Sequence, residues 1–208
     1  MKYIQKQAEP QEILQWKQQS NDDWQPLYAR LGSDLKKTIK QALMQEQGYI
    51  CCYCEQRLDP DDSHVEHFRP QSKFPLNSLD FDNLLCSCQD QIKKGEPRHC
   101  GKLKDNWFDP ALLLSPLDPK CETSFQFTAD GYIQPRYEQD QAAITTITKL
   151  GLDIPALRAL RRQAIEPFLD ESLSVEEFNL FVQKYLLPSS AGDFNPFWSS
   201  IYYLFRGR

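Results

Sequence analysis

The residues best suited to chemistry in this chain lie in one short segment, residues 64–69 (HVEHFR). The Glu66 carboxylate is an oxygen ligand of the kind that Mg²⁺ or Mn²⁺ prefers. The adjacent His67, with an ordinary pKa of about 6.5, can be neutral near physiological pH and accept a proton from water. An ion-binding carboxylate next to a general base is what metal-assisted hydrolysis of a phosphodiester requires.

The spacing within this segment decides which side chains can act together. Neighbouring side chains of a strand point to opposite faces, so His64 and Glu66 are expected to share a face that His67 does not. A local distortion or a tight turn would let Glu66 hold the ion while His67 faces the substrate. His64 is expected either to complete the metal shell or to orient it.

Seven cysteines suggest a second metal site. Cys51 and Cys54 are separated by two residues, a gap that lets both thiolates of one turn reach a single zinc ion. The expected ligands of a structural zinc are Cys51, Cys54, Cys88 and Cys100. Cys52 and Cys86 are expected to be buried bystanders, and the alternative is that all of these cysteines are small buried apolar residues.

Composition limits the possible classes of protein. The 208 residues are 40% hydrophobic and contain no apolar run of about eighteen residues, so a membrane span is not expected. The N-terminal residues lack the apolar stretch of a signal peptide, which predicts a reducing, cytoplasmic location without disulfides. A net charge of -5 argues against nonspecific attraction of the whole surface to nucleic acid.

Local charge differs from the total, because residues 93–104 carry five cations and a single anion. This basic segment lies among the cysteines and could seat a phosphate backbone, although charge runs are often only solvated loops. The expected nucleic-acid contacts are Arg69, Lys73, Lys93, Lys94, Arg98, Lys102 and Lys104.

The periodicity predicts a mainly α fold with a small β-hairpin. A helix is expected from an N-cap at Asp34 to Gly48, and Asp130-Gly131 indicates a hairpin turn. Metal coordination is expected to organise the middle of the chain. We therefore expect an N-terminal helical segment (1–48), a metal-binding core (49–110) and a C-terminal region with a hairpin and helices (111–208).

The C-terminal region carries several helix signals. One helix should end at Gly151, and the next can start at Asp153. Ser174 and Glu177 form a capping box, and Asn195-Pro196 should open a final helix. The aromatic residues expected to form a partner-binding surface on that helix are Trp198, Tyr202, Tyr203 and Phe205.

The order of these motifs resembles the HNH endonuclease family, whose ββα-metal fold wraps a hairpin and a helix around a catalytic ion. The residues that carry the resemblance are Cys51-x-x-Cys54, Glu66-His67-x-x-Pro70, Asn83-Leu84 and Cys88. It implies that His67 is the general base, Glu66 a ligand of a catalytic Mg²⁺ or Mn²⁺, and Asn83 an orienting residue.

The chain departs from the common HNH pattern after Cys88. Eleven residues instead of two precede Cys100, and Gly101 stands where His or Asn usually follows. The second ligand of the catalytic ion is therefore open. His99 is the first candidate, followed by Asn106 and Asp109.

The segment around Asn106–Pro110 and the later hairpin are similar to the retron- and Septu-associated HNH family called PtuB. That resemblance implies a role in anti-phage defence. It also implies an ABC-type ATPase partner like PtuA and, in retrons, a reverse transcriptase and its msDNA. The alternatives are a catalytically silent zinc module that binds nucleic acid or an ATPase, and a small-molecule metallohydrolase. The substrate could be DNA or RNA, including tRNA.

Overall fold

The computed structural model describes residues 1–169 and 172–206, and these ranges contain seven α-helices and four short strands. The helices are α1 (Gln11–Lys17), α2 (Ser33–Glu46), α3 (Cys100–Lys104), α4 (Gln141–Leu150), α5 (Pro155–Ile165), α6 (Val175–Leu186) and α7 (Trp198–Phe205). The strands are β1 (Ser63–His67), β2 (Leu84–Cys88), β3 (Phe125–Phe127) and β4 (Ile133–Pro135). The 3₁₀ turns are η1 (Tyr28–Arg30), η2 (Pro75–Asn77), η3 (Phe81–Asn83), η4 (Pro119–Glu122) and η5 (Glu166–Leu169).

The strands form two separate antiparallel hairpins. In the first, β1 pairs with β2 so that Ser63 faces Cys88 and His67 faces Leu84. In the second, β3 pairs with β4 across the predicted Asp130-Gly131 turn, where Gly131 adopts a φ of 91°. The described chain is therefore helical with two small hairpins, one more than the predicted fold class names.

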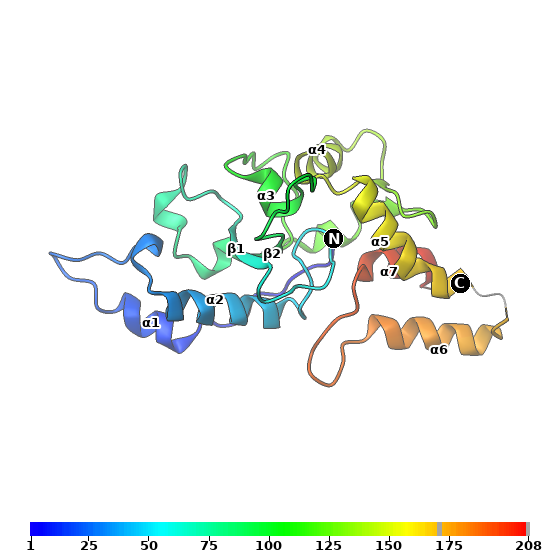
Figure 1. The fold of residues 1–208 in the computed structure, drawn as a ribbon, viewed down its shortest axis with the longest axis horizontal. Helices are drawn as coiled ribbons and strands as arrows, with labels where there is room; N and C mark the ends of the chain where they lie inside the picture. Colours follow the sequence, from blue (N-terminus) through cyan, green and yellow to red (C-terminus); the bar gives the residue numbers. More distant parts are fainter. Residues whose placement is uncertain (170–171, 207–208) are drawn as a thin grey trace.

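The first hairpin is held by the long helix α2, which runs along it (Figure 1). All five residues of β2 are buried, among them Leu84 and Leu85. Helix α2 buries Ile39 and Leu43 on one face, and such burial of apolar side chains is the main force that fixes helix against strand. The short helix α3 contacts β2 as well, so β2 connects the hairpin to both helices.

Several predicted element ends are confirmed. The Ser174 hydroxyl accepts the Glu177 N–H and the Glu177 carboxylate accepts the Ser174 N–H, which completes the capping box of α6. Helix α4 ends at Gly151 in the left-handed region, and Gly48, with a φ of 60°, follows α2. Each of these signals acts within a single turn of backbone.

Three predicted helix starts are wrong. Helix α2 has its N-cap at Gly32, and Asp34 lies inside its first turn. Helix α5 begins at Pro155 because Asp153 accepts the Ile133 N–H and pairs with Arg158 instead of capping.

The predicted start of α7 at Asn195-Pro196 fails for a similar reason. The Asn195 amide donates to the Tyr185 carbonyl, and the left-handed Phe197 precedes the helix. The Asn195 side chain thus binds a carbonyl ten residues away in the chain and does not cap the helix that follows it.

The main buried core contains residues from all three predicted segments. One cluster of buried residues runs from Met1 and Ile4 through both hairpins to Leu157, and a smaller cluster joins the end of α5 to α6 and α7. Trp198 and Phe205 are buried, so these two of the four aromatics predicted to bind a partner pack inside the protein instead. Division of the chain at residues 49 and 110 remains a prediction. None of the described helices has the length and apolarity to cross a membrane.

Candidate active site

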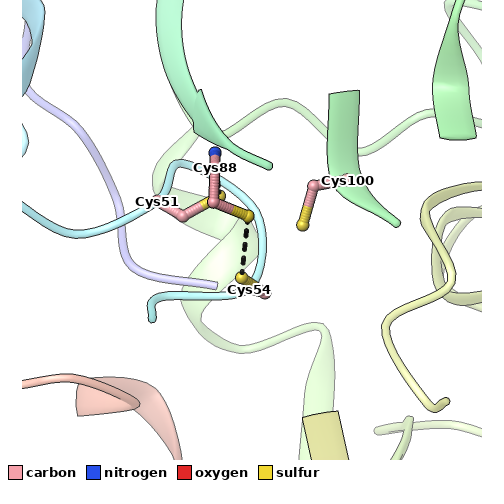
Figure 2. A group of neighbouring side chains, drawn as sticks. All are labelled: Cys51, Cys54, Cys88 and Cys100. Carbon is pink, nitrogen blue, oxygen red and sulfur yellow. Dashed lines mark hydrogen bonds between the residues drawn. The ribbon is translucent and has the colours of Figure 1, made fainter. Parts of the chain in front are cut away.

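The four predicted zinc ligands come together from the turn before β1, from the end of β2 and from the start of α3. Cys51 and Cys54 lie in the turn before β1, Cys88 ends β2 and Cys100 begins α3 (Figure 2). All four are buried and their sulfur atoms lie within 4.8 Å of one another. Cys52 and Cys86 lie outside this group, and so does Cys121.

The geometry of this cysteine cluster fits a tetrahedral metal. Four sulfurs at about 2.3 Å from zinc lie about 3.8 Å apart, and the Cys54 and Cys88 sulfurs are separated by 3.7 Å. Burial alone would raise the pKa of the Cys51 thiol, but hydrogen bonds from four neighbouring thiols outweigh it and lower the pKa well below its ordinary value. The pKa values of Cys88 and Cys100 are raised instead, so the fit to a structural zinc rests on the four soft ligands and their spacing.

His99 lies beside this cluster. Its Nδ1 is 3.2 Å from the Cys100 sulfur and 3.8 Å from the Cys88 sulfur. The Gln89 side chain accepts the His99 N–H and helps to hold this orientation. The ring therefore faces the sulfurs, and its place favours contact with the zinc thiolates over binding an ion at Glu66.

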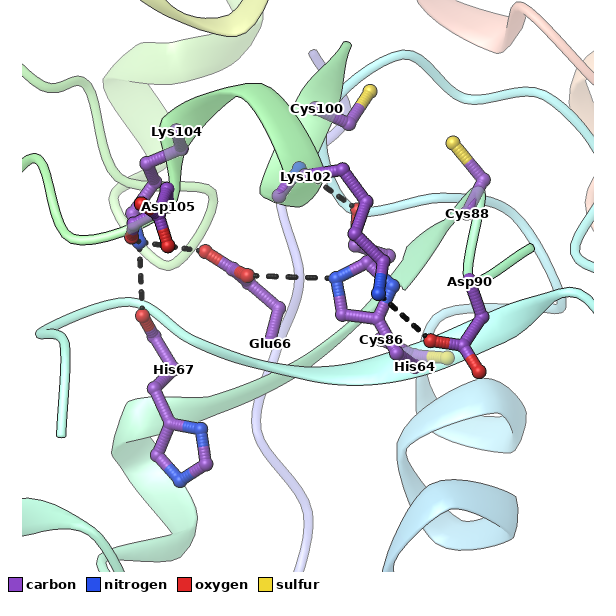
Figure 3. A network of polar contacts seen from close by, with 12 residues as sticks. His64, Glu66, His67, Cys86, Cys88, Asp90, Cys100, Lys102, Lys104 and Asp105 are labelled. Atoms are coloured by element: carbon purple, nitrogen blue, oxygen red, sulfur yellow. Dashed lines mark hydrogen bonds and ion pairs between the residues drawn. The ribbon is translucent and has the colours of Figure 1, made fainter. Parts of the chain in front are cut away.

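Glu66 projects from the middle of the hairpin into a group of fixed donors (Figure 3). One carboxylate oxygen, Oε1, accepts from the Tyr53 hydroxyl at 3.1 Å and from the Lys104 ammonium at 2.7 Å. The other, Oε2, lies 3.7 Å from His64 Nε2. Burial alone would raise the pKa of Glu66, but His64 and Lys104 lower it below its ordinary value. Glu66 is therefore an anion with one oxygen engaged and one turned toward His64.

Gly101 explains how these two side chains meet. A methyl group at this position would lie 2.5 Å from Glu66 Oε2 and 2.7 Å from His64 Nε2, far inside contact distance. The first turn of α3 thus passes directly over the pair, and only a hydrogen atom fits there. His64 Nδ1 is buried without a hydrogen-bond partner among the described residues. The His64 ring consequently occupies space that a side chain at residue 101 would need.

His67 lies on the opposite side of β1 from Glu66, as strand alternation predicts and Figure 3 shows. Its Nε2 is 3.1 Å from the Ser78 carbonyl and 2.8 Å from the Gln71 amide, and the Tyr28 ring packs on it edge to face. A carbonyl only accepts whereas an amide nitrogen donates, so these two contacts call for opposite tautomers of the neutral ring, and they do not decide which ring nitrogen is the basic one. Burial lowers the pKa of His67, and the bond to Ser78 offsets only part of this effect.

Asn83 ties the loop after β1 to the start of β2. Its side-chain oxygen accepts the Arg69 N–H at 2.7 Å, and its nitrogen donates to the carbonyls of Arg69 and Asn77, both at 3.0 Å. Its own carbonyl accepts the Phe68 N–H. These bonds hold the segment that follows His67, which is the contact pattern of an orienting residue.

A cleft of about 500 Å³ opens beside these groups. His64, Glu66 and His67 line it, together with the cations Arg98 and Lys102. The other predicted phosphate contacts except Lys104 are exposed but do not line this cleft: Arg69, Lys73, Lys93 and Lys94. Of the remaining candidates for the second ligand, Asn106 lines the cleft, and Asp109 accepts the Ala111 N–H.

Lys104 does not fit the predicted phosphate-binding set. It is only 2% exposed, and its ammonium contacts Glu66 and the His67 carbonyl. Sequence reasoning missed this role, and it missed Tyr53 as well. The available signals were weak: Lys104 follows Gly101 by about one helical turn, and Tyr53 stands inside the Cys51-x-x-Cys54 turn.

The sequence is similar to three proteins of known name. The chain is 34% identical over 140 residues to a retron Vc95 protein of Vibrio cholerae serotype O1 biovar El Tor, named as a candidate HNH endonuclease. This match covers 64% of the chain and 65% of the relative. The chain is a homologue of the retron- and Septu-associated HNH proteins.

Two further relatives of this HNH group agree. A retron Ec83 protein of Escherichia coli, also named as a candidate HNH endonuclease, is 36% identical over 104 residues, covering 46% of the chain and 40% of that protein. The Septu protein PtuB of Bacillus thuringiensis is 41% identical over 56 residues, covering 26% of the chain and 22% of PtuB. The chain thus matches less than two thirds of the length of each of these relatives. No protein-family model matches it.

Proposed function

We propose that this chain is a metal-dependent HNH endonuclease that hydrolyses phosphodiester bonds of nucleic acid. The observation that carries the proposal is the convergence of Glu66 Oε2 and His64 Nε2 beneath Gly101, inside an open cleft edged by cations. The names of the homologues support the same activity. The β1–β2 hairpin and α3 would form the ββα-metal core, and the four cysteines would bind a structural zinc.

The two ligands proposed for the catalytic ion are Glu66 and His64. Their facing atoms lie 3.7 Å apart, close enough for both to reach one cation. Mg²⁺ or Mn²⁺ bound there would polarise the scissile phosphate and stabilise the leaving oxygen. His64 thereby takes the place that His99 held as the first candidate.

The remaining steps belong to the chain itself. The His67 ring would accept the proton of the attacking water, with Ser78 and Asn83 holding the ring and its loop. Lys104 and Tyr53 would fix the Glu66 carboxylate, and the exposed cations would position the phosphate backbone without reading its sequence. Water would attack the phosphorus and the 3′-oxygen would leave, so the products would carry a 3′-hydroxyl and a 5′-phosphate.

One observation favours the silent zinc module as a second candidate. His67 points away from Glu66 and no distortion of β1 brings the two side chains to one face. A protein that only binds nucleic acid or an ATPase would need the cysteine cluster and the cations but not a working His67.

The test compares the wild-type chain with His67→Ala and Glu66→Gln. Each is incubated with plasmid DNA or total RNA and Mg²⁺ or Mn²⁺, alone and with ATP and a PtuA-like ABC-type ATPase. The proposal expects ion-dependent cutting by the wild type, a loss of about 10²-fold or more in both variants, and unchanged zinc content. Equal cutting by wild type and His67→Ala would exclude His67 as the general base. No turnover in any mixture would support the catalytically silent zinc module.

The biological setting follows from the relatives. PtuB is a Septu protein and the two other relatives carry retron names, so we propose that the chain acts in anti-phage defence. A PtuA-like ATPase and, in a retron, the reverse transcriptase with its msDNA are the proposed partners. Co-purification of the ATPase with the tagged chain checks the first of these.

A further inference from the structure

A second groove lies on a different part of the molecule from the candidate active site. It has a volume of about 500 Å³, and the residues that line it belong to η4, the β3–β4 hairpin with its flanks, and α7. It shares no lining residue with the cleft at Glu66. Whatever it binds therefore contacts the protein outside the proposed cleavage site.

The groove is built around two pairs of a tyrosine and an arginine. The Arg136 guanidinium carbon lies 5.1 Å from the ring centre of Tyr203, and that of Arg206 lies 4.6 Å from the ring centre of Tyr202. Both contacts lie within the range of cation–π attraction, which orders the long side chains before a ligand arrives. A further tyrosine, Tyr137, is 70% exposed at the same groove.

The charge of the groove is positive although the whole chain is acidic. Neither Arg136 nor Arg206 forms an ion pair within residues 1–169 and 172–206. The acidic lining residue, Glu122, is already engaged, because it pairs with Lys2 at 3.7 Å and accepts the Tyr3 N–H. The Arg206 guanidinium donates to the Tyr202 hydroxyl, but neither guanidinium has a carboxylate partner among the described residues, so both charges are available to an anion.

We propose that this groove binds a single strand of nucleic acid. Proteins that hold single strands without sequence preference combine aromatic rings, on which bases stack, with cations that follow the backbone. Tyr202 already stacks on Trp198 and against Arg206, so the exposed Tyr137 ring is the platform for a base, and Arg136 and Arg206 are the cations for the phosphates beside it. Bases in a duplex already stack on one another, so the exposed face of Tyr137 favours an unpaired strand.

This inference goes beyond the proposed cleavage and does not need it. The groove would hold a strand while the cleft, if it cuts, acts on another part of the same molecule. It also gives Tyr202 and Tyr203 a role different from the predicted protein-binding surface.

The experiment measures binding without cleavage. Fluorescence anisotropy of a labelled oligothymidine of about 20 nucleotides is recorded with the purified full chain, without added divalent cations. The groove variant is Arg136→Ala/Arg206→Ala. The control is Arg162→Ala/Lys184→Ala, which removes two equally exposed charges that line neither the groove nor the cleft. Circular dichroism and zinc content show that each variant is folded.

We expect the groove variant to bind the oligonucleotide at least about tenfold more weakly than the control. The slope of log affinity against log salt should fall by about 1.4, since each phosphate contact to a single strand adds about 0.7. Tyr137→Ala should lose about fivefold or more and Tyr137→Phe should not, because stacking needs only the ring.

Three outcomes overturn the proposal. Groove and control variants could bind the oligonucleotide equally. A duplex of the same length could bind through the groove as tightly as the single strand. A polyglutamate peptide could displace the oligonucleotide at equal charge concentration, which would assign the groove to an acidic protein segment. Because no cutting is measured, these results are independent of whether the cleft is a nuclease.

Discussion

The β1–β2 hairpin and α3 carry two groups of side chains that differ in how open they are to solvent. On one side the cysteine cluster is closed, with four buried sulfurs that together suit a tetrahedral ion. On the other side Glu66 and His64, the two ligands proposed for a catalytic ion, meet at an open cleft. A closed set of soft ligands is typical of a structural metal, and an open set with a polar cleft is typical of a catalytic one.

The cysteine cluster and the Glu66–His64 pair share one scaffold, the connection between β2 and α3. Cys88 and Cys100 stand at the ends of the β2–α3 connection, and Gly101, the next residue, covers Glu66 and His64. Zinc at the sulfurs would therefore fix the position of α3 over the second site. Because α3 belongs to both sites, a change at the cysteine cluster is expected to disturb the second site, whereas a change at Glu66 or His64 should leave the cysteine cluster intact.

The largest effect is expected from the closed site. Cys88→Ser removes a zinc thiolate from the buried cluster, and metal binding in such sites contributes free energy on the order of 10 kcal/mol to folding. We expect loss of zinc and of cooperative thermal unfolding, measured by elemental analysis and calorimetry. The control Cys121→Ser replaces another buried cysteine outside the cluster and should keep its zinc. A folded Cys88→Ser protein without zinc would contradict a structural role for the cluster.

The buried ion pair at the open site should give the next largest effect. Lys104→Met leaves the buried Glu66 carboxylate without its charged partner, which costs about 3–5 kcal/mol of unfolding free energy at neutral pH. The measurement is urea unfolding at several pH values. The deficit should shrink toward acid pH. In the variant burial raises the pKa of Glu66, so this carboxyl becomes neutral at a pH where the wild-type group, with its lowered pKa, is still ionised.

A double variant provides the control for that pair. Lys104→Met/Glu66→Gln removes both charges and should recover much of the stability, since no buried charge is left alone. If the single and double variants were equally unstable at every pH, the pair would not be the cause.

Gly101→Ala should separate stability from metal binding. The new methyl group would displace the ends of Glu66 and His64, which can move, so the unfolding free energy should change by less than about 1 kcal/mol. The affinity for Mn²⁺ and the cleavage rate should fall by about 10- to 100-fold because the two ligands no longer converge. Gly32→Ala is the matched control, with nothing within 4 Å of the added methyl group. Unchanged Mn²⁺ affinity in Gly101→Ala would exclude this pair as the ion site.

The smallest effect is a displacement of the pH profile. Burial lowers the pKa of His67, so the ring stays neutral, and able to accept a proton, to a lower pH than an exposed histidine. The acid limb of the cleavage rate should therefore lie below the ordinary value of about 6.5. Initial rates at constant Mg²⁺ and ionic strength measure it. A limb above that value would contradict His67 as the base in this environment.

Signals that act within one turn were readable from the sequence. The Cys51-x-x-Cys54 turn, the Ser174–Glu177 capping box and the Gly131 and Gly151 turns depend on groups a few residues apart. The alternation of β1 also placed His64 and Glu66 on one face, because side-chain direction in a strand follows directly from residue order. The family resemblance rested on these same short motifs.

Only the tertiary structure decided the partners of these groups. Lys104 was expected among the surface cations, but the packing of α3 on β2 buries it against Glu66. The same packing brings Gly101 over His64, and Asp153 and Asn195 lose their predicted capping roles to distant backbone groups. The physical reason is that a charge or hydrogen-bonding group takes the partner that folding brings nearest. When the two groups lie on different elements, the spacing of residues along the chain does not give the distance between them in the folded protein.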